Sequence, residues 1–297
     1  MFEEIKGSEK WTKVEKINKG WSKDSKYYIE TASGEKLLLR ITDISRFEAK
    51  KKEYDIVTKY SHTGIVMSMP RGFGVFDEGR QVYSLLTWIE GEDLEKVLPK
   101  LPEDTQYSLG RSAGNILRKI HSIPVDMKDK SPQTKTEKKL KQLQSYLDSG
   151  LRYPGDETAV DFIKNNIDKI DSVPPVYQHG DFHPGNLIYM PDHEIGVIDF
   201  NRWEVGDPYE EFYKLESFAT DVSIPYCRGQ IDSYFNDNIP EQFWDVLAVY
   251  VAHAALYSIK WAEPFGKKDI DNMVRICRKI FKDYDGFKRS VPIWYED

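Results

Sequence analysis

The chain has 297 residues, of which 40% are hydrophobic and 13% aromatic, so it can bury a large core in two lobes and is not a disordered chain. Its net charge of −7 argues against a nucleic-acid partner, because phosphate backbones attract basic surfaces. Its two cysteines, Cys227 and Cys277, exclude a disulfide framework, and we expect both to be free in a reducing compartment.

No stretch of the sequence predicts a signal peptide or a membrane segment. The N-terminal residues are acidic and lack the apolar stretch of a signal peptide. The longest uncharged apolar run, 246–259, is interrupted by His253 and is shorter than a bilayer requires. We therefore expect a cytoplasmic protein with no membrane partner, and we favour a monomer.

The first ninety residues predict five strands and one helix. The strands follow from alternating or continuous apolar residues bounded by turn residues such as Ser33-Gly34 and Asp77-Glu78-Gly79. The predicted strands are 11–17, 26–30, 36–41, 70–76 and 81–89, and the predicted helix is 46–60. A polar turn, 18–25, joins the first two strands, and Trp88-Ile89-Glu90 forms the link to the second part.

The remaining residues, 91–297, predict a mainly helical lobe. Leu109, Ala113, Leu117 and Ile120 follow the spacing of one apolar helix face. Asp156 is expected to be the N-cap of a later helix. The predicted helices are 103–121, 137–148, 157–170, 241–261 and 269–283. The helix 241–261 is apolar nearly all round, which indicates a central position.

One polar stretch dominates this lobe: His-Gly-Asp-Phe-His-Pro-Gly-Asn at 179–186, followed by Val-Ile-Asp-Phe at 197–200. The flanking residues predict a loop, a hairpin and an acidic residue after its second strand. Asp181 and Asn186 have the spacing of a kinase catalytic loop, in which the Asp accepts the substrate hydroxyl proton and the Asn holds Mg²⁺. Asp199 would be the second magnesium ligand, since Mg²⁺ prefers hard oxygen donors.

Other interpretations of this stretch remain open. His179, Asp181 and His183 alternate, so on a strand they would share one face and could form the metal cluster of a hydrolase. The stretch could also be a hydrogen-bonded loop in a relative without activity. The combination of the eight-residue block, the hairpin and Asp199 favours phosphoryl transfer.

The stretch closely resembles the aminoglycoside phosphotransferase family, whose loop is H-G-D-x-H-x-x-N followed by I-D-[FW]. Gly206-Asp207-Pro208 resembles the next family turn, in which the Asp supports the catalytic loop. The resemblance is specific over 177–212. It implies an α+β, bilobal protein-kinase-like fold, with a small β-rich N-lobe (1–90) and a larger, mainly helical C-lobe (91–297).

The same resemblance implies a site for ATP or GTP with Mg²⁺. Asp181 would position and deprotonate the acceptor hydroxyl, and Asn186 and Asp199 would hold the metal. Arg40 would grip phosphates where kinases have Lys, paired with Glu53 or, as the alternative, Glu48. The polar turn would cover the phosphates, and the link would contact adenine. These nucleotide-binding residues are Gly20, Ser22, Ser25, Arg40, Glu53, Trp88, Ile89 and Glu90.

The acceptor is less closely defined by the sequence. Residues 1–90 carry a net charge of +2 and the remainder −9, which suits a cationic substrate, although acidic surfaces also serve solubility. The resemblance favours an aminoglycoside as the acceptor; a macrolide, choline, homoserine or another sugar is the alternative acceptor. The alternative class of function is a non-catalytic regulator that binds a nucleotide. The substrate-binding candidates are His183, Trp203, Glu210, Glu211, Glu263 and Asp269, with Tyr209, Trp261 and Asp271 nearby.

Overall fold

The computed structural model describes residues 2–18 and 24–296. The chain forms two compact units. Unit 1 comprises Met1–Asp93 and Asn186–Trp203, and unit 2 comprises Leu94–Gly185 and Glu204–Asp297. The division differs from the predicted one at 90/91, because a segment from the middle of the sequence belongs to the first unit.

The reason for this difference is strand pairing. The short strand β6 (Glu92–Asp93) pairs antiparallel with β8 (Leu187–Tyr189), which pairs with β9 (Ile195–Val197). Met67 forms a parallel bridge to Val197. The predicted hairpin is therefore present, and its backbone hydrogen bonds tie it to unit 1.

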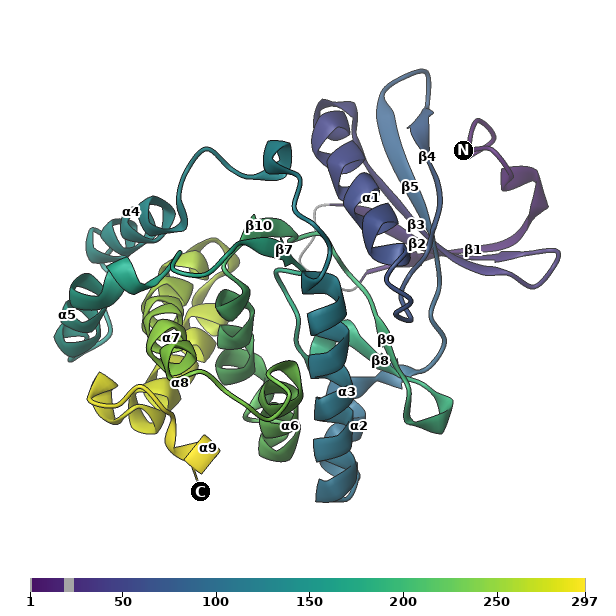
Figure 1. Cartoon of the computed structure of the whole chain (residues 1–297). Helices are drawn as coiled ribbons and strands as arrows, with labels where there is room; N and C mark the ends of the chain where they lie inside the picture. Colours follow the sequence, from purple (N-terminus) through teal and green to yellow (C-terminus); the bar gives the residue numbers. More distant parts are fainter. Residues whose placement is uncertain (1, 19–23, 297) are drawn as a thin grey trace. The chain divides into compact units, whose positions relative to one another are not determined.

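Unit 1 is built on a five-stranded antiparallel sheet (Figure 1). Its strands are β1 (Trp11–Ile17), β2 (Ser25–Thr31), β3 (Lys36–Asp43), β4 (Pro70–Phe76) and β5 (Gln81–Thr87), in the order β1-β2-β3-β5-β4. The helix α1 (Phe47–Ser61) packs against β4 and β5. The predicted fold class, with five strands and one helix in the first lobe, is confirmed.

Strand β3 is buried on both faces, and this decides where Arg40 points. Leu37, Leu39 and Ile41 pack into one apolar cluster with residues of β2, β4 and β5. Because successive side chains of a strand point to opposite faces, Arg40 lies on the other face, where α1 supplies one of its partners, Glu53.

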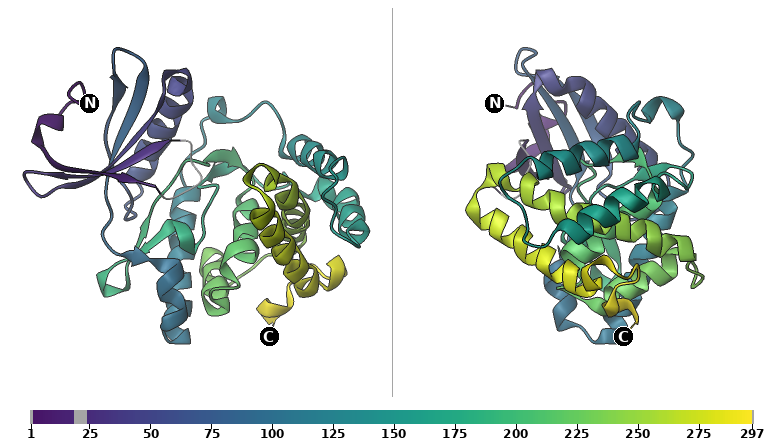
Figure 2. Two further views of the ribbon diagram at one scale, coloured as in Figure 1. Left: turned by 180° about the vertical axis from the view of Figure 1, so that it is seen from behind. Right: turned by 90° about the vertical axis from the view of Figure 1, so that its left-hand side faces the viewer.

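Unit 2 is mainly helical (Figures 1 and 2). Its longer helices are α3 (Glu103–His121), α4 (Lys135–Leu147), α5 (Glu157–Asn166), α6 (Ile224–Tyr234), α7 (Glu241–Trp261) and α8 (Lys267–Asp283), with short helices α2 (Leu94–Val97) and α9 (Ile293–Glu296). Helix α7 contacts α4, α5 and α8, as its apolar surface predicts. No helix among residues 2–18 and 24–296 is long and apolar enough to cross a membrane.

Several local features of unit 2 differ from expectation. Helix α6 and the pairing of β7 (Val176–Gln178) with β10 (Glu204–Gly206) were not predicted. Asp156 is the N-cap residue of α5, as the sequence predicts, but its side chain makes no capping hydrogen bond. Its carboxylate instead accepts hydrogen bonds from Tyr146 and Arg152, and these hold α4 to α5.

Helices α3 and α6 approach each other through glycines. A Cβ atom added at Gly110 would lie well inside van der Waals contact with the carbonyl oxygen of Tyr226. A Cβ at Gly229 would meet the carbonyl of Tyr107 in the same way. The two backbones are therefore packed directly together, and a methyl group could enter only if the helices moved apart.

We expect Gly110→Ala to lower the free energy of unfolding by about 1–3 kcal/mol through overpacking, although alanine stabilises an open helix position by about 1 kcal/mol. Chemical denaturation measures the change. Gly150→Ala is the matched control, because a Cβ there meets nothing within 4 Å; its effect should stay within about 0.5 kcal/mol. Equal stability of both variants would show that the close approach is not a constraint.

Candidate active site

The loop that contains Asp181 follows β7 in unit 2, and its shape is fixed by His179. The His179 side chain is completely buried, and its Nδ1 accepts a hydrogen bond from the Asp181 N–H at 3.2 Å. Gly180 takes a left-handed φ of 79°, which favours glycine. His179 is therefore a structural residue of the loop, whereas Asp181 has 20% of its side chain exposed.

Glu211 holds the same loop through its backbone. The Gly180 N–H donates to Glu211 Oε1 at 2.8 Å, and His121 Nε2 lies 3.9 Å from that oxygen. Burial alone would raise the pKa of Glu211, but His121, His179 and the Gly180 N–H hold the pKa below its usual value. Glu211, a predicted substrate contact, is thus already engaged as the anchor of the loop.

Asp207, which the sequence predicts as the support of the loop, contacts the residue before the loop and not the loop itself. Its Oδ1 accepts from the Tyr209 N–H at 2.8 Å and its Oδ2 from the Tyr250 hydroxyl at 3.0 Å. Its backbone carbonyl accepts from Gln178 Nε2 at 2.6 Å, directly before the loop. Burial raises the pKa of Asp207 to about 6.

Lys214 is the residue in this unit that sequence reasoning missed. Its Nζ lies 2.7 Å from Asp181 Oδ1, and only 6% of its side chain is exposed. It also lies over the rings of Tyr213 and Phe218, at 4.9 and 5.4 Å from the centroids. Although burial opposes the charge, Tyr213 and Asp181 raise the pKa of Lys214. Asp181 is therefore paired with an ammonium group, which no motif spacing indicated.

His183 completes the surroundings of Asp181. Its Nε2 lies 3.8 Å from Asp181 Oδ1, its Nδ1 accepts from the Gly185 N–H at 3.2 Å, and its ring packs on Phe218. The ring therefore braces the loop backbone beside the carboxylate.

Glu210, another predicted substrate contact, is buried between two lysines. Lys139 Nζ lies 2.7 Å from its carboxylate, and Lys135 donates to it as well. Burial would raise the pKa of Glu210, but the two ammonium groups hold it well below the usual value. Glu210 thus joins α4 to the segment after β10.

The remaining acceptor candidates lie nearer the surface. Trp203, the last residue of the 186–203 segment, is partly exposed. Glu263 follows α7, is exposed and pairs with Lys260. Asp269 is partly exposed in the first turn of α8.

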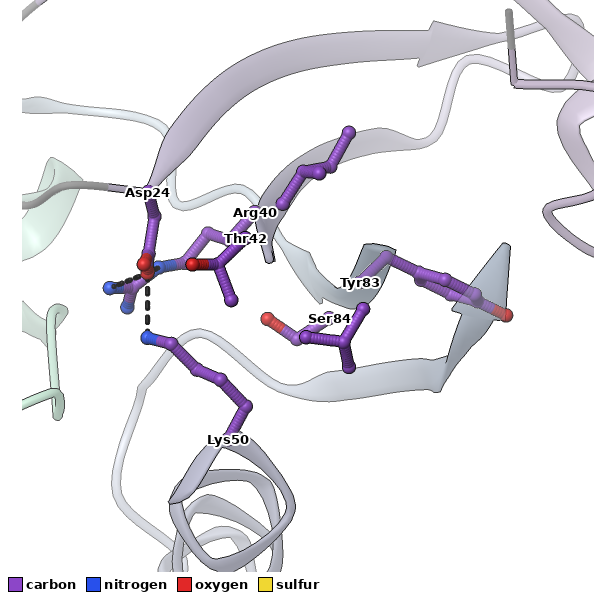
Figure 3. A pocket seen from close by; sticks show the side chains of 8 residues that line it. Asp24, Arg40, Thr42, Lys50, Tyr83 and Ser84 are labelled. Atoms are coloured by element: carbon purple, nitrogen blue, oxygen red, sulfur yellow. Dashed lines mark hydrogen bonds and ion pairs between the residues drawn. The ribbon is translucent and has the colours of Figure 1, made fainter. Parts of the chain in front are cut away.

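In unit 1, Arg40 lies at the centre of a buried charge cluster (Figure 3). Its Nη1 lies 3.1 Å from Glu53, the partner that the sequence favoured, and 3.3 Å from Asp199. Its Nη2 lies 2.8 Å from Asp24. Burial alone would lower the pKa of Arg40, but Glu53, Asp199 and Asp24 raise it. Glu48, the alternative partner, is exposed.

Asp199 lies two residues after β9 in a left-handed conformation, with φ at 62°, which is uncommon outside glycine and recurs at functional sites. Its Oδ2 lies 3.7 Å from Lys26 Nζ. The Asn186 carbonyl accepts from the Ile198 N–H at 3.1 Å, so the hairpin holds Asn186 beside the residue that precedes Asp199. One carboxylate and one amide fit Mg²⁺ chemically. Among the residues described, no three His, Cys, Asp or Glu side chains group as a metal site.

The other residues predicted for the nucleotide site belong to the polar turn before β2 and to the link after β5. Gly20 and Ser22 fall outside the described residues, and Ser25 begins β2 opposite Ile41. In the link, the Trp88 N–H donates to the Lys36 carbonyl at 2.9 Å, and Glu90 pairs with the Lys36 side chain. Ile89 packs against Gly196 of the hairpin, where a Cβ would fall 2.8 Å from its side chain.

The sequence and the fold of this chain are similar to those of known phosphotransferases. The model of the phosphotransferase enzyme family matches residues 13–248. Aminoglycoside 2'-phosphotransferase-IIIa in complex with GDP is 15% identical, covers 94% of each chain and has a TM-score of 0.70. A mutant of aminoglycoside phosphotransferase APH(4)-Ia with AMP-PNP and hygromycin B is 15% identical over 94% of this chain and 95% of that chain, with a TM-score of 0.69. No curated protein sequence matches significantly.

The buried carboxyl of Asp207 predicts a pH-dependent contribution to stability. Its folded pKa of about 6 exceeds the usual 3.8, so its contribution is complete below about pH 4 and is lost as the pH rises through about 6. Asn cannot ionise. The free energy of unfolding of Asp207→Asn, relative to the native chain, should therefore improve by about 2–3 kcal/mol from pH 4 to pH 7. Denaturation at a series of pH values measures it, and a constant difference would contradict the prediction.

Proposed function

Because the chain belongs to the phosphotransferase enzyme family, we propose that it transfers the γ-phosphoryl group of ATP or GTP to a hydroxyl group of a small molecule. The observation that carries the proposal is the cluster in unit 1, where one buried guanidinium contacts both Glu53 and Asp199. Phosphoryl transfer requires a cation that binds phosphate, a carboxylate on a helix that orients this cation, and a carboxylate that binds Mg²⁺.

The acceptor side of the reaction depends on Asp181. Phosphoryl transfer proceeds through a loose transition state, so the catalytic group mainly positions the acceptor hydroxyl and receives its proton late. The ammonium of Lys214 lies 2.7 Å from this carboxylate and orients it by a charge-assisted hydrogen bond. His179 and Glu211 fix the loop backbone on either side of Gly180, so the carboxylate is preorganised.

The nucleotide side depends on Arg40, Asn186 and Asp199. Arg40 would hold phosphate oxygens by charge-assisted hydrogen bonds. Asn186 and Asp199 would hold Mg²⁺, which neutralises charge on the triphosphate when it is bound. The backbone of Trp88, Ile89 and Glu90 would contact the base, and Gly20, Ser22 and Ser25 would cover the phosphates.

For the acceptor, we propose an aminoglycoside. The support is a likeness to proteins of known structure in complex with hygromycin B and with kanamycin, together with the acidic balance of 91–297. Since Glu210 and Glu211 are engaged internally, His183, Trp203, Glu263 and Asp269 remain the proposed contacts. A macrolide, choline, homoserine or another sugar is the competing acceptor.

A screen with labelled ATP and GTP against aminoglycosides, macrolides and amino alcohols tests the activity. We expect Asp181→Asn to lower turnover by roughly 10²–10⁴-fold, because it removes proton acceptance and positioning, while nucleotide affinity stays nearly unchanged. Near-native turnover in this variant would refute the role of Asp181. A regulator that only binds nucleotide would show no Mg²⁺-dependent turnover at all, and a metallohydrolase would retain Zn²⁺ or Mn²⁺ after purification.

We expect Lys214→Met to lower kcat by roughly 10–100-fold, because Asp181 loses the contact that orients it and a displacement of about 1 Å can cost about 10²-fold. Lys214→Arg should recover part of the loss, and the nucleotide KM should change little in either variant. Steady-state kinetics measures the split. Lys138→Met removes a lysine that pairs with Glu204 at the surface and is the control; an equal loss there would contradict a specific role.

A further inference from the structure

Asp24 occupies a position between two buried cations of unit 1 (Figure 3). A single oxygen, Asp24 Oδ2, accepts from Arg40 Nε at 3.2 Å, from Arg40 Nη2 at 2.8 Å and from Lys50 Nζ at 2.6 Å. Only 2% of the Asp24 side chain and 9% of the Lys50 side chain are exposed. Three N–H donors converging on one anionic oxygen are the surroundings that a phosphate oxygen requires.

These three groups and Glu53 form a closed ring of ion pairs. Arg40 and Lys50 each contact Asp24, and each also contacts Glu53, at 3.1 and 2.8 Å. Asp199 adds a further contact to Arg40 Nη1. The Nε and Nη2 edge of the guanidinium faces Asp24, and Nη1 faces Glu53 and Asp199. A phosphate can therefore bind Arg40 along that edge only in place of the Asp24 carboxylate.

Asp24 is the ring member that can leave. Glu53 lies within the fifteen-residue helix α1, which fixes its backbone. Asp24 lies in a bend before β2, so its side chain can turn without breaking a helix or a strand. After it leaves, Glu53 and Asp199 still balance the charges of Arg40 and Lys50, so no buried cation is left without a counter-charge.

Burial alone would raise the pKa of Asp24, but Arg40 and Lys50 hold it below the usual value. Asp24 is therefore an anion at neutral pH, and it competes for the two cations with any phosphate.

We propose that Lys50 is a second phosphate-binding cation beside Arg40, and that the Asp24 carboxylate occupies their shared phosphate position until a nucleotide displaces it. The inference rests on the proposed function, because it assigns the site to the phosphates of a nucleotide. It makes Asp24 an internal competitor that weakens nucleotide binding, and it gives Lys50 a role although the run of lysines at 50–52 looks like a solvated surface.

The first test removes the competing charge. Titration calorimetry with inorganic triphosphate and with ADP, both without Mg²⁺, measures the Kd of the native chain and of Asp24→Asn. We expect the variant to bind each probe about tenfold more tightly, which corresponds to about 1.4 kcal/mol. Asp55→Asn is the matched control, since it removes an exposed carboxylate of α1 that pairs with Lys51, and it should leave both affinities unchanged.

The second test removes the proposed cation. Lys50→Met should weaken triphosphate and ADP binding by about tenfold, whereas Lys51→Met, the neighbour on the exposed side of the helix, should not. Lys50→Arg keeps the charge and should recover part of the loss. Thermal unfolding shows whether each variant is folded, and Asp24→Asn alone decides the question if Lys50→Met is not.

The outcomes separate this inference from the proposed function. Unchanged or weaker binding by Asp24→Asn would show that Asp24 is only a structural counter-ion, and would overturn the inference even if the chain phosphorylates an acceptor. Binding that Lys50→Met leaves unaltered would overturn the role of Lys50. Tighter binding by Asp24→Asn, with no turnover on any acceptor, would support the inference and refute the phosphotransferase activity. No binding of either probe by any variant would refute both.

Discussion

The burial of the Arg40 guanidinium is the constraint on which the geometry of the charged cluster in unit 1 depends. A cation that is 5% exposed on a central strand must be surrounded by counter-charges, since an unpaired buried charge costs several kcal/mol. The carboxylates that meet this need come from three places: Asp24 in the bend before β2, Glu53 in helix α1, and Asp199 in the segment after β9. Because each must reach the same guanidinium, Arg40 fixes the position of Asp199 relative to the sheet, although Asp199 is 159 residues further along the chain.

The loop that contains Asp181 depends on one short segment of unit 2. Asp207, Glu210, Glu211 and Lys214 lie within eight residues of one another, and each contacts a different part of the β7 region or of α4. This density explains why the segment is buried although it is rich in charge. Each carboxylate in it has at least one oxygen matched by an ammonium, a hydroxyl or a backbone N–H, although Glu211 Oε2 has no hydrogen-bond partner among the described residues. A conformational change in this segment would therefore reach Asp181 directly.

The sequence predicted the elements and the Arg40–Glu53 contact better than the roles of the charged residues. Periodicity locates strands and helices because each has its own repeat, and Glu53 followed from its place on the helix after the Arg40 strand. Burial of a charge leaves no such pattern. Lys50 belongs to a run of three lysines, and Glu210 and Glu211 stand together in an acidic stretch, so all three resemble solvated surface. The Lys50–Asp24 and Lys135–Glu210 pairs join residues 26 and 75 positions apart, and Glu211 accepts from the backbone N–H of Gly180. No local pattern in the sequence indicates these three contacts.

Because the sequence does not show which charged residues are buried, the negative net charge of 91–297 is a poor guide to how strongly the protein attracts a cationic acceptor. Net charge counts every carboxylate equally, but a substrate is attracted mainly by those that are exposed and unmatched, since neighbouring cations cancel the field of the others. Glu210 is neutralised by two lysines, and Glu216 is held by Lys279 and the Trp294 indole N–H. The Asp181 carboxylate itself is matched by Lys214. An amino group of a cationic sugar placed next to Asp181 would therefore meet an ammonium as well as a carboxylate, and its attraction must come from acids further from the reacting hydroxyl.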